Sequence, residues 1–143
     1  ALCVTLSGEL GAGKTTLVRG FLRALGVEGS VRSPSYALLE TYELAARRVL
    51  HLDLYRLRDP EEVTALGLSD YDQPDAIWLV EWPERAGDLL TAPDLLIQLA
   101  YAGTGRQVTL KAFTDRGIRW LTALPPTATK YRRPPERSAD AAS

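Results

Sequence analysis

A glycine-rich segment near the start of the chain carries residue types suited to phosphate chemistry. Residues 8–15 read Gly-Glu-Leu-Gly-Ala-Gly-Lys-Thr, which fits the pattern of Gly, four residues, Gly, Lys and then Ser or Thr. The glycines allow successive backbone N–H groups to turn inward and cradle phosphate oxygens. Lys14 is suited to the β- and γ-phosphates of a nucleotide, and the hydroxyl of Thr15 is suited to Mg²⁺. The segment therefore predicts a nucleotide-binding loop.

The flanking residues place this loop between a strand and a helix. Residues 2–6 form a short apolar run that is typical of a buried strand, and Arg19 and Arg23 lie opposite an apolar face in the helix that follows. That apolar face consists of Leu17, Val18, Phe21, Leu22 and Leu25. The predicted nucleotide-binding residues are Glu9, Leu10, Gly11, Ala12, Gly13, Lys14, Thr15 and Thr16. We expect Thr16 to be an early residue of the helix rather than a second metal ligand.

Two further acidic side chains stand at the ends of predicted strands. Residues 76–80 are continuous and apolar, which predicts a central strand covered on both faces, and Glu81 ends it. An acid in that place suits Mg²⁺ or its water, and a solvent-facing acid is the alternative. In an earlier strand, alternation places His51, Asp53 and Tyr55 on one face. A His and an acid on one face favour a functional role, although a solvent-facing surface is the commoner situation for a single His.

The remaining pattern predicts two hairpins and two short helices. Residues 37–44 and 48–55 are β-like runs separated by only three residues, which predicts an antiparallel pair. A second hairpin, interpreted as scaffold rather than site, spans residues 94–113. Helices are predicted from residue 59 to about 66 and over residues 115–124. In the latter we expect the inward-facing side chains to be Ile118, Trp120 and Leu121.

The segment Ser-Pro-Ser-Tyr at residues 33–36 follows the first predicted helix. Pro34 drives Ser33 toward extended geometry. In many nucleotide switches, a mobile segment shortly after the phosphate loop senses the γ-phosphate. An ordinary turn that enters a strand explains the same pattern equally well, and both interpretations stand at this point.

Composition and charge restrict the class of protein. The 143 residues suit one domain, which we place at residues 1–124. Seventeen basic and eighteen acidic residues leave a net charge of -1, so there is no electrostatic footprint for tight, non-specific nucleic-acid binding. One cysteine, Cys3, excludes an internal disulfide, and no apolar run reaches membrane-spanning length. We expect a cytoplasmic protein that has no membrane contact.

Residues 125–143 differ from the rest of the chain. Four of the nine prolines lie between residues 125 and 135, and few apolar side chains follow. This composition predicts a disordered tail, because it offers too little apolar surface to bury. The tail is mildly basic, so contact with RNA or with a partner is a possible role for it.

Four segments together resemble the TsaE family, formerly named YjeE. They are residues 8–16, 33–36, 51–57 and 81–82, in the order and spacing of that family, and the match covers about residues 1–113. Many proteins share the phosphate loop, whereas the segments His-Leu-Asp-Leu-Tyr-Arg-Leu and Glu-Trp are specific. The family is the bacterial ATPase component of the machinery that makes threonylcarbamoyladenosine at position 37 of tRNA.

The resemblance implies an α/β fold of three layers, similar to P-loop NTPases, with a mixed parallel and antiparallel sheet flanked by helices. It implies ATP and Mg²⁺ as cofactors, and a Mg²⁺-dependent ATPase activated by its partners, the TsaD and TsaB proteins. Carbamoyl transfer itself would belong to TsaD, and any contact with tRNA would be indirect or through the tail. Family members normally carry a strand and a helix before the phosphate loop, and we expect this pair to be missing from the present sequence.

Carried over residue by residue, the resemblance also implies roles in the site. Asp53 and Glu81 would serve the metal and the attacking water, in an order that stays open, and Trp82 would lie in the same region. Ser35 would present its hydroxyl to the γ-phosphate or the metal, at a position where family members usually carry Thr. The predicted catalytic residues are Lys14, Asp53 and Glu81, and the predicted metal ligands are Thr15, Asp53 and Glu81.

Three other functions are compatible with a phosphate loop. A small-molecule kinase generally needs an arginine-rich lid, and no such insertion separates the predicted core elements. A GTPase generally reads guanine with an Asn-Lys-x-Asp segment, and this sequence contains no Asn. A non-catalytic docking protein, in which ATP orders residues 33–36 and so controls partner binding, stays open beside the ATPase.

Overall fold

The computed structural model describes residues 1–90 and 92–123, so the predicted tail at residues 125–143 lies outside the described residues. In chain order the elements are β1 (Leu2–Gly8), α1 (Lys14–Ala24), β2 (Leu39–Glu43), β3 (Arg48–Asp53), α2 (Glu61–Ala65), the 3₁₀ helix η1 (Leu68–Tyr71), β4 (Ile77–Glu81), the 3₁₀ segment η2 (Pro83–Leu89), β5 (Leu95–Ala102), β6 (Gly105–Ala112) and α3 (Asp115–Thr122). Both predicted hairpins and the predicted central strand are confirmed, with small shifts at their ends.

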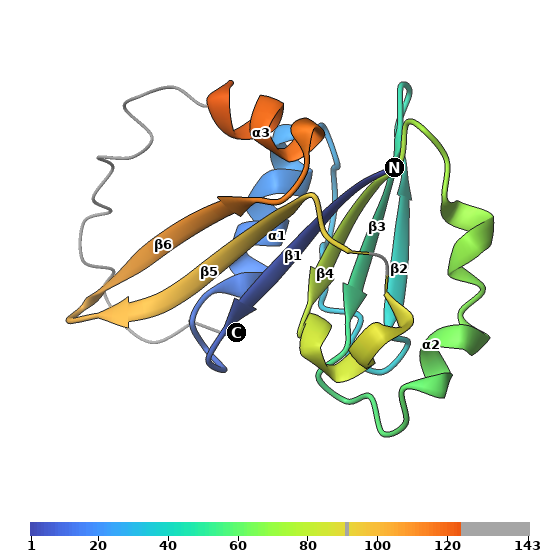
Figure 1. Cartoon of the computed structure of the whole chain (residues 1–143), viewed down its shortest axis with the longest axis horizontal. Coiled ribbons are helices and arrows are strands. Elements are labelled where there is room, and N and C mark those ends of the chain that lie inside the picture. The colour runs from blue at the N-terminus through green and yellow to red at the C-terminus, as the bar shows by residue number, and fades with distance from the viewer. Residues whose placement is uncertain (91, 124–143) are drawn as a thin grey trace.

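The six strands form one mixed sheet in the order β2-β3-β4-β1-β5-β6 (Figure 1). The four inner strands are parallel, and the edge strands β2 and β6 pair antiparallel with their neighbours. Glu81, the last residue of β4, is in register with Leu6 of β1 on one side and with Asp53 of β3 on the other. The carboxyl ends of three parallel strands therefore meet at one edge of the sheet, which is where open α/β sheets place their ligands.

Helical segments cover both faces of this sheet. Val18 and Leu22 of α1 pack into the core on one face, and Leu121 of α3 joins them there. On the opposite face, Val63 of α2 and Ala86 of η2 pack against buried side chains of β3 and β4. This is the predicted three-layer arrangement, and Figure 1 shows α1 and α3 beside the sheet. The longest described helix, α1, has only 11 residues, and no helix in residues 1–90 and 92–123 has the length and apolar character of a membrane span.

The alternation predicted for the third strand is confirmed within β3. Leu50 and Leu52 belong to the core on the face of α2, and His51 and Asp53 alternate with them toward the face of α1. The strand ends at Asp53, so Tyr55 lies beyond the alternating part of the chain. His51 is fully buried, which excludes the alternative of a solvent-facing surface at this position.

The inward face predicted for α3 is partly wrong. Leu121 packs against the core as expected, but Ile118 is 50% exposed and Trp120 is 37% exposed. The helix instead turns Gly117 inward, four residues before Leu121 and therefore on the same face. A Cβ atom at Gly117 would lie 2.0 Å from the carbonyl oxygen of Asp94. This close approach of helix and strand is open only to glycine, and it determines which side of α3 faces the sheet.

α1 shows a smaller departure of the same kind. Its most deeply buried apolar residues are Val18 and Leu22, which are four residues apart, whereas Leu17 is 38% exposed. One residue along an α-helix is a rotation of about 100°, so Leu17 falls at the margin of the buried stripe. Thr16 lies within the first turn of α1, as predicted.

Candidate functional site

The predicted phosphate loop joins the end of β1 to the start of α1. Gly8 has a φ of 148°, and a Cβ atom there would lie 2.4 Å from the carbonyl oxygen of Leu99 on β5. Gly13 has a φ of 109°, a Cβ atom there would meet open space, and it is the N-cap residue of α1. Backbone N–H groups at the start of a helix have no partner within the helix and favour an anion. The loop therefore presents an open, electropositive turn at the edge of the sheet where the parallel strands end.

Lys14 is completely buried and lies folded back onto this loop. Its Nζ donates to the carbonyl oxygens of Gly8 at 2.6 Å and of Glu9 at 2.9 Å, and it lies 4.3 Å from the centre of the Trp82 ring. Burial lowers the pKa of Lys14 below its usual value, and the negative charge of Glu81 opposes that shift. The ammonium group is thus held by two carbonyl oxygens, which are acceptors of the same kind that a phosphate would offer.

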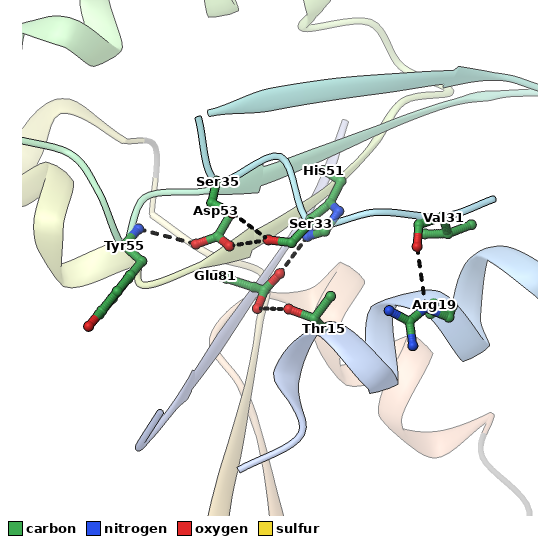
Figure 2. A network of polar contacts seen from close by, with 9 residues as sticks. All are labelled: Thr15, Arg19, Val31, Ser33, Ser35, His51, Asp53, Tyr55 and Glu81. Atoms are coloured by element: carbon green, nitrogen blue, oxygen red, sulfur yellow. Dashed lines mark hydrogen bonds and ion pairs between the residues drawn. The ribbon is translucent and has the colours of Figure 1, made fainter. Parts of the chain in front are cut away.

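Glu81 is the centre of a buried polar network (Figure 2). Its Oε1 accepts a hydrogen bond from Thr15 Oγ1 at 2.8 Å, and its Oε2 lies 2.5 Å from His51 Nε2. All three side chains are at most 3% exposed. A buried carboxylate without partners is costly, so a rotation of Glu81 that broke either contact would be unfavourable. The two contacts therefore hold its side chain in one orientation. The alternative of a solvent-facing acid at the end of this strand is therefore excluded.

His51 is not among the predicted site residues, and the structure adds it. An ionised carboxylate can only accept hydrogen bonds, so the contact with Glu81 in that form requires the tautomer of His51 that carries a hydrogen on Nε2. The other ring nitrogen, Nδ1, is buried and has no hydrogen-bond partner among the described residues. The signal in the sequence is the alternation of His51 with Asp53, but the pairing of their strand with the one that ends at Glu81 is a tertiary feature.

Asp53 lies beside Glu81 in the sheet and contacts the segment that follows the first helix. Its Oδ2 accepts from Ser33 Oγ at 2.5 Å, and its Oδ1 accepts from the backbone N–H of Tyr55 at 3.1 Å. The hydroxyl of Ser35 lies 3.5 Å from Ser33 Oγ and reaches Asp53 only through it (Figure 2). The family resemblance singles out Ser35 in this segment, whereas the structure places Ser33 in direct contact with the acid.

Trp82 lies in the same region as the loop lysine. Its backbone is left-handed, with a φ of 56°, and turns the chain from β4 into η2. Its ring centre is 5.1 Å from that of Tyr55, and the guanidinium carbon of Arg85 lies 5.6 Å from it. With its ring also close to Lys14, Trp82 forms one wall beside the ammonium group. The other predicted loop residues differ in exposure, since Leu10 is 56% exposed and Ala12 is buried.

The second hairpin also contacts the phosphate loop. From the sequence this hairpin is interpreted as scaffold, and such a contact is not predicted. Tyr101 Oη donates to the carbonyl oxygen of Leu10 at 3.2 Å, and Arg106 Nε donates to that of Ala12 at 3.2 Å. Neither residue belongs to a motif of the sequence. These contacts place the end of the β5–β6 hairpin against the outer side of the phosphate loop.

The oxygen atoms of this site fit a magnesium ion whose coordination is completed by phosphate. Among residues 1–90 and 92–123, no three His, Cys, Asp or Glu side chains gather into a group that could hold a metal by itself. Mg²⁺ is usually bound by one or two protein oxygens together with waters and substrate phosphates. Thr15 and Glu81 offer a hydroxyl and a carboxylate in direct contact beside the phosphate loop. This pair has the hard oxygen ligands that such an ion prefers.

Comparison with known proteins gives consistent matches. The family model described as "Threonylcarbamoyl adenosine biosynthesis protein TsaE" matches residues 1–108. A relative from Haemophilus influenzae is 44% identical over 124 residues, covering 87% of this chain and 78% of the relative. A relative from Streptomyces coelicolor is 38% identical over 125 residues, covering 84% of each chain. Both are named tRNA threonylcarbamoyladenosine biosynthesis protein TsaE. The crystal structure of Bacillus subtilis YdiB is similar in fold, with a TM-score of 0.70 at 30% identity, and the match covers 85% of this chain and 74% of that one.

Proposed function

The chain belongs to the TsaE family, and on that basis we propose that it is the Mg²⁺-dependent ATPase of the machinery that makes threonylcarbamoyladenosine in tRNA. The observation that carries this proposal is the hydrogen bond between Thr15 and Glu81. It joins the phosphate loop to the acid at the end of a central strand, which is the arrangement that phosphate-loop ATPases use. Catalysis by positioning and charge needs the hydroxyl of the loop and the carboxylate in one site, and Thr15 and Glu81 are in direct contact.

Binding of the nucleotide is assigned to the loop and the start of α1. The loop N–H groups would face the phosphates, and Lys14 would exchange the carbonyl oxygens of Gly8 and Glu9 for β- and γ-phosphate oxygens. Charged phosphate oxygens are stronger acceptors than neutral carbonyls, so this exchange favours the bound state. Thr15 and Glu81 would hold Mg²⁺, which supplies positive charge that stabilises the phosphate oxygens during transfer.

The two acids receive different roles in this proposal. Glu81 touches Thr15, and we therefore assign it to the metal side of the site. Asp53 touches Ser33 instead, in the segment that follows the first helix, and we assign it to the attacking water. A carboxylate beside the γ-phosphate orients that water and accepts its proton. The hydrogen bond from Ser33 to Asp53 also connects residues 33–36 directly to the acid that would orient the attacking water.

TsaD and TsaB are the proposed partners, on the strength of the family resemblance. The transition state of phosphoryl transfer is stabilised only when all charges and the water are in position. A partner that completes this set raises the rate without contributing to nucleotide binding. We therefore expect the isolated chain to be a slow ATPase and the complex to be a faster one.

The test is the release of phosphate from Mg²⁺·ATP, with and without the purified TsaD–TsaB pair, and with Lys14→Ala as the control variant. We expect release to increase when the pair is added and to fall to background with Lys14→Ala. If ATP binds but release never exceeds that of Lys14→Ala, the ATPase assignment is wrong.

A docking switch is the second candidate, and the contact between Ser33 and Asp53 favours it. Through this contact the state of the site could be transmitted to residues 33–36, whose Tyr36 is 85% exposed. The two candidates differ in what a non-hydrolysable ATP analogue does. The docking switch predicts unchanged complex stability and normal tRNA modification over many turnovers with the analogue, whereas the ATPase predicts that modification stops early.

A further inference from the structure

The end of the β5–β6 hairpin lies against the outer side of the phosphate loop. Gly8, the last residue of β1, pairs with Leu99, and β5 continues beyond this point to Ala102. Tyr101 and Arg106 are directly opposite each other near the end of the hairpin, and the guanidinium carbon lies 4.2 Å from the centre of the tyrosine ring. The two side chains thus form one unit beyond the carboxyl end of β1.

Each side chain of this unit holds one carbonyl group of the loop. Tyr101 donates to the carbonyl oxygen of Leu10, and Arg106 donates to that of Ala12, both at 3.2 Å. In a trans peptide, the C=O of one residue and the N–H of the next point in opposite directions. A carbonyl drawn outward to the hairpin therefore turns the following N–H, of Gly11 or of Gly13, away from the hairpin and toward the interior of the loop.

Both of these peptide groups are followed by a glycine with a positive φ. Gly11 has a φ of 81° and Gly13 a φ of 109°, and a glycine lacks the side chain that would restrict rotation of the adjacent peptide. The contacts of Lys14 with Gly8 and Glu9 are the ones that a phosphate would replace. The contacts from the hairpin lie on other carbonyls, so they can persist when a nucleotide binds.

We propose that Tyr101 and Arg106 are positioning residues that orient the Gly11 and Gly13 N–H groups toward the phosphates of the nucleotide. The inference rests on the proposed nucleotide site and extends it to a hairpin that carries no recognised motif. Neither residue needs to touch the nucleotide. Orientation before binding saves the ordering cost that a free loop would meet when it closes on the phosphates.

The experiment compares Arg106→Gln and Tyr101→Phe with a matched control, Lys111→Gln. Lys111 is exposed on the same strand, β6, and its replacement removes the same charge as Arg106→Gln without a described contact to the loop. The dissociation constant of Mg²⁺·ADP is measured by calorimetry. The ¹⁵N order parameters of Gly11 and Gly13 are measured in the nucleotide-free protein, together with Tm.

Loss of one supporting hydrogen bond is expected to weaken binding about tenfold for Arg106→Gln and about threefold for Tyr101→Phe. The N–H order parameter is expected to fall at Gly13 in the first variant and at Gly11 in the second. Lys111→Gln should match the wild-type protein in both measurements. Because the hairpin itself stays paired, Tm is expected to be unchanged in all three variants.

Two results would overturn the inference while leaving the nucleotide site intact. In the first, both variants bind Mg²⁺·ADP like the wild-type protein and keep rigid glycines. In the second, Arg106→Gln weakens binding with unchanged order parameters, and the loss vanishes at high salt, which identifies an effect of charge alone. If the wild-type protein itself binds no Mg²⁺·ADP, the proposed function fails, and the order parameters of the nucleotide-free protein still decide whether the hairpin holds the loop.

Discussion

Glu81 connects two elements through its two carboxylate oxygens. Thr15 approaches one oxygen from α1, and His51 approaches the other from β3. Asp53 is similarly occupied, by Ser33 and by the backbone of Tyr55. Because the two acids have different partners, replacing Glu81 or Asp53 by its amide tests the proposed role of that residue alone. The shape of the side chain is kept.

Glu81→Gln and Asp53→Asn are both expected to retain ATP binding and to lose about 100-fold or more of the partner-stimulated phosphate release. Their dependence on Mg²⁺ should differ, because only Glu81 touches the predicted metal ligand Thr15. Titration of nucleotide binding with Mg²⁺ should show weakened metal binding in Glu81→Gln and normal metal binding in Asp53→Asn. Wild-type turnover in both variants would contradict the assigned roles.

His51 is expected to act through Glu81 and not on the nucleotide. His51→Ala should lower kcat about tenfold with little change in KM, as removal of a supporting hydrogen bond to a metal ligand commonly does. His51→Gln should recover much of this loss, because its amide nitrogen can occupy the place of Nε2, 2.5 Å from the carboxylate. His51→Asn is shorter and should not recover it. Equal activity of the Gln and Asn variants would show that the contact with Glu81 is not what matters.

Among the elements, α3 depends on a small number of contacts at its start. Thr114 accepts a hydrogen bond from the N–H of Gly117 and donates to Asp94 Oδ1 at 2.7 Å. The close approach of Gly117 to the backbone of Asp94 then holds the helix against the start of β5. The position of α3 is therefore set by a cap and a glycine contact, while Ile118 and Trp120 are both only partly covered.

Gly117→Ala is expected to destabilise the protein by about 2 kcal/mol, because the added methyl group overlaps the carbonyl of Asp94 and forces the helix away. Gly20→Ala is the matched control. Gly20 lies inside α1, and a Cβ atom there would meet open space, so the same change should raise stability by up to about 1 kcal/mol. Urea denaturation of both variants measures these differences. Equal stability of the two would show that the contact at Asp94 is loose in solution.

At the scale of the whole molecule, the sheet separates two apolar layers and places the polar network at one end of one of them. Val49, Ile77 and Leu79 line the face toward α1, and Leu50 and Val80 line the opposite face. The network around Glu81 continues the first of these faces toward the carboxyl ends of the strands. The side chains of Thr15, His51 and Glu81 are buried because this network extends the core.

Cys3 is buried on the opposite face of the sheet, and the pKa of its thiol reflects that burial. Burial, with a smaller contribution from the charge of Asp94, raises the pKa of its thiol from 9.0 to about 12. The folded protein therefore keeps this proton at pH values where the unfolded chain loses it, and stability declines as pH rises from about 9 to about 12. Below pH 9 both states are protonated and the contribution of the thiol is fully present.

The difference in unfolding free energy between the wild-type protein and Cys3→Ala should fall by about 1.4 kcal/mol between pH 8 and pH 10. Denaturation of both proteins at the two pH values gives this difference, and comparison with the alanine variant removes the contribution of other groups that titrate there. A difference that is independent of pH would show that the thiol is accessible to water in the folded state.

Several features of this protein follow from local sequence. The phosphate loop, the apolar strand before it, the helix after it and both hairpins are determined by residue type and spacing over short stretches. The resemblance to the TsaE family rests on segments of the same kind, and the comparisons confirm it. Local patterns suffice here because glycine conformation, apolar periodicity and short turns depend on neighbours in the chain.

The tertiary structure decided how these pieces meet. Thr15 and Glu81 are 66 residues apart in sequence, and Arg106 and Ala12 are 94 apart. Contacts over such separations depend on β4 and β5 lying on either side of β1, which no local pattern specifies. The same strand order buries His51 against Glu81. Local patterns predicted most of the chemical groups, and the order of the strands determined which of them touch.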